Sequence, residues 1–312
     1  SIPGTVTVGS LDIGHGLGSG GSADTNSTAV GRDALDGTTN GAINNTAVGS
    51  AALSAVTSGD ENTAVGRNAL TVFTGSDATA IGSGAADVAA AQTNLTAVGR
   101  NALGVATSGN NNTAVGTVSL QTVDGEGNTA VGSYSLSADC VSENTAVGRL
   151  ALSSFTGSNA TAVGSYAAVA ATDATLLTAV GYNSLGAVIG GLENTGIGYD
   201  AGRSITTGDY NTALGSQALS VSNVDALRNT AIGRASMSSG ACVNDNTAVG
   251  YNSLSAFAGS NATAVGSYAA DVAAAQTNLT AVGMNALGVA TSGNNNTAVG
   301  ASSLQTVDGT QN

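Results

Sequence analysis

The stretch Asn62-Thr63-Ala64-Val65-Gly66, followed by Arg67-Asn68-Ala69-Leu70, sets the pattern for almost the whole chain. Its core, T-A-V-G or a close variant, occurs seventeen times, and Leu follows the motif glycine by four positions in twelve copies. The repeat positions that represent the pattern in four copies are Asn62, Val65, Gly66, Leu70, Asn112, Val115, Gly116, Asn144, Val147, Gly148, Asn246, Val249 and Gly250. A period of about 16–18 residues repeated in this way indicates a solenoid, in which each coil packs on its neighbours.

The residues of the motif favour a β-strand. Thr and Val are β-branched, and the glycine after Val permits a corner with positive φ. Each repeat has room for this strand, a second short strand around the Leu, and two turns. We therefore predict an all-β parallel β-roll of about seventeen coils over residues 26–312, preceded by a Gly-rich lead or capping segment at residues 1–25. Helical solenoids need about 33–47 residues per repeat, so they fit poorly.

Alternation along the strand predicts which residues share a face. Thr and Val lie on one side and Ala on the other. We expect Thr and Val to face the inside of the coil, which would leave an outward stripe of Ala at which three chains could approach closely. The Asn before Thr recurs in many coils, for example Asn62, Asn112, Asn144 and Asn246, and we expect these amides to form a ladder along the stack.

The composition excludes several classes of partner. Only 9% of the 312 residues are charged, Trp is absent, and the net charge is −13 with no Lys. Nucleic-acid binding and anionic membrane surfaces are disfavoured, because both require a basic face. No apolar run approaches the about 20 residues of a membrane span, so we expect no membrane insertion by this segment.

Catalytic chemistry is poorly supplied, so we predict no enzyme activity, no metal site and no cofactor. The single His, His15, lies in the Gly-rich lead, outside the repeat array. The adjacent acids Asp60 and Glu61 form the closest carboxylate pair, and turn chemistry explains them as well as catalysis does. Acidic turns such as 123–127 could accept Ca²⁺, but the G-G-x-G-x-D signature of calcium-binding rolls is absent.

The two cysteines, Cys140 and Cys242, occupy the same place in coils that are six repeats apart. At strand spacing that separation is about 29 Å, beyond the about 7 Å between Cα atoms that a disulfide allows. They are therefore either two free buried thiols or partners in bonds between chains.

Basic and aromatic residues gather at the corner that follows the motif glycine. The position directly after that glycine holds Arg67, Arg100, Arg149, Tyr182, Tyr199 and Tyr251, as well as Arg32 and Arg234. Tyr134, Tyr166 and Tyr268 come one position later. This corner ridge is a candidate surface for a glycan or receptor. The alternatives are corner packing and pairing of Arg with acids of an adjacent chain.

A longer repeat is superimposed on the coils. The text of Ala90–Gly99 returns at Ala274–Gly283, and the text around Phe73 returns around Phe257. The chain therefore grew by duplication of blocks of coils.

Copies such as Asn26-Ser27-Thr28-Ala29-Val30-Gly31 and Asn159-Ala160-Thr161-Ala162-Val163-Gly164 resemble the N-S-V-A-I-G-x-x-S repeat of trimeric autotransporter adhesin heads and the N-T-A-V-G repeats of phage and viral tail fibres. The resemblance covers residues 26–312. It implies a left-handed parallel β-roll that assembles as a homotrimer in a cell-surface or virion fibre. In this chain Thr replaces the first Val of the family repeat in most copies, and the repeat is slightly longer.

We therefore expect a non-enzymatic structural and adhesive fibre segment, either of a viral tail fibre or of a bacterial surface adhesin. It would be extracellular and form a stiff trimeric rod that attaches to a host receptor, glycan or surface. The alternative is a monomeric solenoid that binds ice or glycans. Against ice binding, the motif supplies one regular Thr column rather than two.

Overall fold

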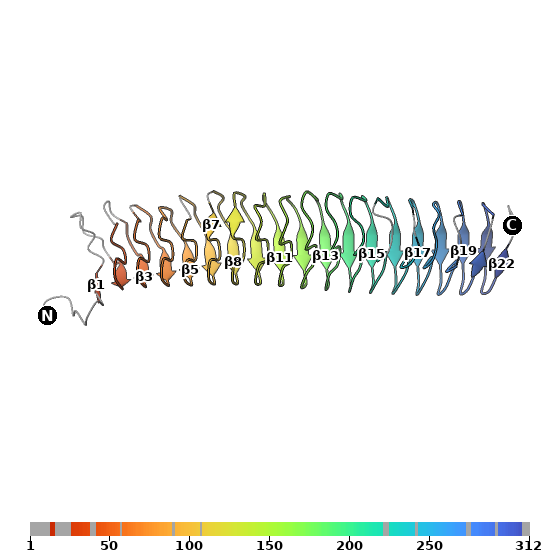
Figure 1. Cartoon of the computed structure of the whole chain (residues 1–312), viewed down its shortest axis with the longest axis horizontal. Helices are drawn as coiled ribbons and strands as arrows, with labels where there is room; N and C mark the ends of the chain where they lie inside the picture. Colours follow the sequence, from red (N-terminus) through yellow and green to blue (C-terminus); the bar gives the residue numbers. More distant parts are fainter. Residues whose placement is uncertain are drawn as a thin grey trace. The chain divides into compact units, whose positions relative to one another are not determined.

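The computed structural model describes residues 13–15, 26–37, 42–56, 58–88, 91–106, 108–220, 225–240, 243–272, 276–290 and 293–307. Every regular element in these residues is a β-strand (Figure 1). The chain divides into two units, Ser1–Ser153 and Ser154–Asn312, which we call unit 1 and unit 2. Each unit is a parallel β-solenoid, which confirms the predicted fold class.

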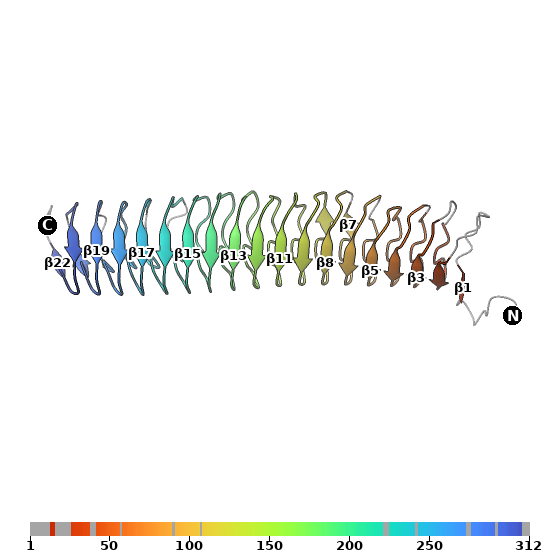
Figure 2. The same ribbon diagram turned by 180° about the vertical axis from the view of Figure 1, so that it is seen from behind.

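The T-A-V motif forms one strand per coil, and successive strands lie side by side within each unit (Figure 1, Figure 2). The motif strands of unit 1 are β2 (Thr28–Val30), β3 (Thr46–Val48), β4 (Thr63–Val65), β5 (Thr79–Ile81), β6 (Thr96–Val98), β8 (Thr113–Val115), β10 (Thr129–Val131) and β11 (Thr145–Val147). Those of unit 2 are β12 (Thr161–Val163), β13 (Thr178–Val180), β14 (Thr195–Ile197), β15 (Thr212–Leu214), β16 (Thr230–Ile232), β17 (Thr247–Val249), β18 (Thr263–Val265), β19 (Thr280–Val282) and β21 (Thr297–Val299).

The register of these strands aligns like with like. In β3 and β4, for example, Thr46 pairs with Thr63 and Val48 with Val65. The one antiparallel partner among the described strands is β1 (Ile13–His15), which pairs with β2 at the start of unit 1. The remaining residues of the lead at 1–25 lie outside the described residues.

The prediction of a second strand around the Leu is wrong. That segment is a turn in each coil, since Leu70 and its equivalent Leu103 have φ values of 52° and 50°, in the left-handed region. A second strand occurs elsewhere in the coil and, among the described residues, only in two places. These pairs are β7 (Val105–Ala106) with β9 (Thr122–Val123), and β20 (Val289–Ala290) with β22 (Thr306–Val307).

The prediction that Thr and Val face inward is also wrong. The central alanines of the strands after β2 are buried, as Ala64 and Ala130 show with 0% exposure, whereas Val65 and Val131 are each 36% exposed. In β2, the first motif strand, Ala29 is half-buried. The reason is the narrow interior of the coil. At Gly196, which replaces the central Ala in β14, an added Cβ would lie 2.7 Å from Cγ of Leu185. In this coil Gly202 takes the place of the Leu, and the buried Leu185 of the preceding coil reaches the inner face of the strand, so even Ala would clash there.

The motif glycine is required by a close approach between coils. Gly66 has a φ of 138°, and a Cβ at that position would lie 2.4 Å from the carbonyl oxygen of Gly82 in the next coil. The predicted corner with positive φ is therefore confirmed.

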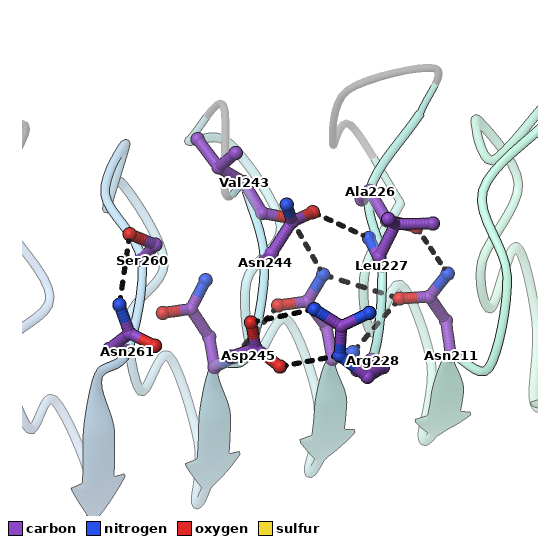
Figure 3. A network of polar contacts seen from close by, with 11 residues as sticks. Asn211, Ala226, Leu227, Arg228, Val243, Asn244, Asp245, Ser260 and Asn261 are labelled. Carbon is purple, nitrogen blue, oxygen red and sulfur yellow. Dashed lines mark hydrogen bonds and ion pairs between the residues drawn. The ribbon is translucent and has the colours of Figure 1, made fainter.

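The predicted Asn ladder is confirmed in both units. In unit 1, Oδ1 of Asn112 accepts a hydrogen bond from the backbone N–H of Asn128 at 2.9 Å, and Oδ1 of Asn128 accepts one from the N–H of Asn144 at 3.0 Å. In unit 2 the ladder runs from Asn194 through Asn211 and beyond, and Figure 3 shows how Nδ2 of Asn211 reaches the carbonyl oxygen of Ala226 at 2.7 Å. Each amide thus pairs buried backbone groups that would otherwise lack partners.

The ladder is interrupted where apolar residues take over. In these places Ala and then Leu replace Asn in successive coils, and a fully buried Phe precedes the Ala by five positions. The three groups are Phe73, Ala78 and Leu95 in unit 1, and Phe155, Ala160 and Leu177, then Phe257, Ala262 and Leu279, in unit 2. Each Phe supplies the large apolar volume that a core of Ala and Leu lacks.

Candidate functional site

A regular surface in each unit is the outer face of the motif strands, which we call the Thr–Val face. It consists of the Thr and the Val, Ile or Leu of the motif strands, and none of these positions carries a charge. The apolar row is partly exposed along its length, for example Ile81 at 43% in unit 1 and Leu214 at 42% in unit 2. Because neighbouring strands lie about 4.8 Å apart, this row forms a continuous apolar band.

The outward Ala stripe that we predicted as the contact between chains does not exist. Its alanines line the inside of the coils, so they are unable to meet a second chain. The surface that does face outward is the Thr–Val face. Successive side chains of a strand point to opposite faces, which fixes the residues that share a face. This alternation does not say which face lies inside the coil.

The corner ridge is mainly basic in unit 1, which also holds Tyr134, and mainly aromatic in unit 2, which also holds Arg234. Unit 1 holds Arg67, Arg100 and Arg149, and all three are exposed. The Nη2 atom of Arg67 donates a long hydrogen bond of 3.5 Å to Oγ of Ser83 in the next coil. Arg67 and Arg100 are two coils apart, with Ser83 at the same position between them, so the arginines do not form one compact site.

Unit 2 holds tyrosines that contact one another. The rings of Tyr182 and Tyr199 stack with their centroids 5.6 Å apart, and Tyr166 packs edge-on against Tyr182 at 5.8 Å. Both Tyr182 and Tyr199 are about half exposed, at 49% and 52%. Each ring thus covers part of its neighbour and presents an edge to solvent.

A second group in unit 2 links Arg234, Tyr251 and Tyr268. The Arg234 guanidinium carbon lies 5.5 Å from the centroid of the Tyr251 ring, and its Nη1 donates to Tyr251 Oη at 3.3 Å. Tyr268 packs edge-on against Tyr251 at 5.1 Å. A hydrogen bond between the phenols lowers the pKa of Tyr251, with Arg234 adding to the effect, and raises the pKa of Tyr268. These three ridge residues therefore contact one another in the structure, whereas their sequence spacing indicated only that they lie along the same corner.

Asp60, an acid considered for catalysis, has a structural role in a hydrogen bond between coils. Oδ1 of Asp60 accepts a hydrogen bond from the backbone N–H of Ile43 at 2.8 Å. Oδ1 of Asp209 accepts the equivalent bond from the N–H of Leu192, also at 2.8 Å. The same arrangement joins Asn244 to Leu227 in Figure 3, beside the exposed ion pair between Arg228 and Asp245 at 2.7 Å. Within the described part of the chain, no three side chains of His, Cys, Asp or Glu gather as metal ligands would.

Cys140 is buried and forms no disulfide with another described residue of the chain. Burial raises the pKa of its thiol to about 12. Such a thiol is a poor nucleophile at neutral pH. Cys242 lies outside the described residues. His15 is described only through its backbone, which pairs with Thr28.

A hollow in unit 2, which the sequence did not predict, is lined in part by Asp271, Asn285 and Gln305. These residues come from successive coils, so no short motif contains them. The duplication of blocks of coils could have drawn attention to these positions. The earlier block has the same three residue types at the equivalent positions, Asp87, Asn101 and Gln121.

Comparisons with known proteins give no family assignment. No protein-family model, no curated protein and no solved structure matches the chain. Among the residues that the structure describes there is also no helix of the length and apolarity needed to span a membrane.

Proposed function

We propose that this chain is a non-enzymatic structural and adhesive segment of an extracellular fibre, in a viral tail fibre or a bacterial surface adhesin. We further propose that three copies assemble through their Thr–Val faces into a stiff rod. The observation that carries the proposal is the uninterrupted, uncharged row of Thr and partly exposed Val, Ile or Leu in each unit. The resemblance of the repeat to adhesin heads and tail fibres supports the same interpretation, and the left-handed twist of the roll stays a prediction from that resemblance.

A second copy of the same chain suits this face for two physical reasons. Its residues repeat at one spacing, so identical faces can interdigitate along their whole length. The face also carries no charge that would have to be desolvated, although the chain has a net charge of −13. Exposed apolar bands of this extent are typical of interaction sites. Closed symmetry is the usual form of such homo-oligomers.

Co-purification of tagged and untagged copies tests the assembly. We expect an untagged wild-type chain to co-purify with a tagged chain when both are expressed together. The double change Val163→Asp and Val265→Asp places two charges on the Thr–Val face, where these residues are 37% and 39% exposed, and should abolish co-purification. The matched control is Val243→Asp on the loop side, at a residue 40% exposed.

Unchanged co-purification of the double variant would contradict the proposed interface. Equal loss in Val243→Asp would show that any added charge disrupts association, and the Thr–Val face would have no special role.

Ice binding is the second candidate, and one observation favours it. The Thr column points outward on a regular sheet, rather than inward as we expected. A thermal hysteresis assay on the purified chain tests this function. Hysteresis that disappears after substitution of Thr178 and Thr195 by larger residues would support it.

A further inference from the structure

A cavity of about 390 Å³ lies in unit 2 at the side of the coils that carry β20 and β22. Its lining residues are Asp271, Val272, Asn285, Gly288, Val289 and Gln305. The volume falls within the range of about 300–1,000 Å³ that is usual for small-molecule sites.

The cavity exists partly because residue 288 has no side chain. A Cβ on Gly288 would lie 3.8 Å from Oδ1 of Asp271 and 3.4 Å from the carbonyl oxygen of Asn285, which are ordinary contacts. The Cβ of a larger residue at position 288 would therefore fit without a clash, and the rest of its side chain would fill the space beside the Asp271 carboxylate. The backbone of Asp271 is held in place, since its carbonyl oxygen accepts hydrogen bonds from the N–H of Ala256 at 2.9 Å and from Oγ of Ser255 at 3.2 Å.

The polar lining offers acceptors and donors but no positive charge. Asp271 supplies a carboxylate, and Asn285 and Gln305 supply amides that both donate and accept. An anionic ligand would find no basic partner among the lining residues. A calcium ion would need six to eight oxygen ligands, more than one carboxylate and two amides provide. A neutral ligand with several hydroxyl groups matches this set of side chains.

The rest of the wall is apolar. Val272 and Val289 are 52% and 44% exposed and can contact the C–H groups of a ligand. Tyr268 occupies the same coil position as the lining residue Asn285, one coil earlier. The two segments are adjacent, because the N–H of Asn285 donates to the carbonyl oxygen of Ser267 at 3.0 Å. Tyr268 is 37% exposed and packs edge-on against Tyr251, so a partly exposed aromatic ring lies one coil away from Asn285.

Unit 1 contains a natural control. The equivalent positions of the earlier block are Asp87, Val88, Asn101, Gly104, Val105 and Gln121. Burial raises the pKa of the Asp87 carboxyl as it does that of Asp271. The equivalent corner of unit 1 has no aromatic residue, however, because Gly84 stands in the place of Tyr268.

We propose that the unit 2 cavity binds one neutral sugar residue of a glycan, with Asp271, Asn285 and Gln305 bonding to its hydroxyls and Tyr268 packing on its C–H face. This inference deepens the adhesive part of the proposed function and rests on it for its biological use. It does not depend on trimer formation, since all the named residues belong to one chain.

Saturation-transfer NMR with the full chain tests the site. The probes are the methyl glycosides of glucose, galactose, mannose and N-acetylglucosamine. We expect transfer from the protein to at least one of them. The change Gly288→Val should weaken that binding at least tenfold, and Tyr268→Gly, which recreates the residue of unit 1, should weaken it several-fold.

The matched control is Gly104→Val in unit 1, which should leave the affinity within twofold of the wild type. Absence of transfer to all four glycosides would overturn the proposal, as would equal losses in Gly288→Val and Gly104→Val. The native mass of each variant is measured in parallel. A monomer that still binds sugar would contradict the trimeric fibre but support the sugar site. A trimer that binds none of the sugars would support the fibre but contradict the site.

Discussion

The two sides of each coil follow different constraints. On the sheet side, nearly every coil presents the same three residues, whereas on the loop side the length of the coil varies and Asn alternates with Ala and Leu. Packing against the buried Leu explains why the inner residue of the strand stays small. The outer residues are equally uniform although they are partly exposed, and strand propensity and duplication both favour this uniformity. Their regularity is what an interface between copies would require.

The interior of the coil should be the most sensitive region, and its three buried Phe residues, of which Phe73 is one, its most sensitive positions. Phe73→Ala removes a fully buried ring from a core that otherwise holds mainly Ala and Leu. We expect the free energy of unfolding to fall by about 4 kcal/mol. Urea denaturation of the variant and the wild type measures the change, and a loss below about 1 kcal/mol would show that the ring is not packed as described.

The inner and outer rows of one strand can be compared directly through Ala130 and Val131. Ala130→Leu adds volume on the inside and should cost about 3 kcal/mol of unfolding free energy. Val131→Leu adds volume on the outside, at a residue 36% exposed, and should change it by less than about 0.5 kcal/mol. The same denaturation experiment distinguishes them. If the effects were reversed, the assignment of inside and outside would be wrong.

The ladder should matter somewhat less than the apolar interior. Asn128→Ala leaves the N–H of Asn144 and the carbonyl of Val141 without their side-chain partners, which lie at 3.0 Å and 2.8 Å in the wild type. We expect a loss of about 2 kcal/mol. Hydrogen exchange of the Asn144 amide should accelerate at the same time, and unchanged exchange would contradict the role of Asn128 as its partner.

The smallest effect concerns Cys140. In a Cys242→Ser variant, the folded protein should not react with a thiol reagent at pH 8, because burial raises the pKa of the Cys140 thiol to about 12. The folded state favours the protonated thiol, so its contribution to stability is complete below the ordinary value of 9.0 and is lost as the pH rises through about 12. Stoichiometric labelling of the native protein at pH 8 would contradict this burial.

The sequence alone predicted the parallel solenoid, the Asn ladder and the corner at the motif glycine, because each depends on a spacing that recurs along the chain. It failed on the direction of the strand faces. Alternation places Thr63 and Val65 on one face of the strand and Ala64 on the other, but it does not say which face packs against the buried Leu70. The unit 2 cavity was also beyond sequence reasoning, since Asp271, Asn285 and Gln305 meet only once the coils are stacked.

The native mass of the purified chain tests the central claim most directly, by light scattering or native mass spectrometry. Assembly through the Thr–Val face predicts a mass near three times the 29.6 kDa of one chain. A monomer at 29.6 kDa across the concentration range would contradict it. The outward Thr–Val face would then need a different ligand, and ice would become the first one to examine.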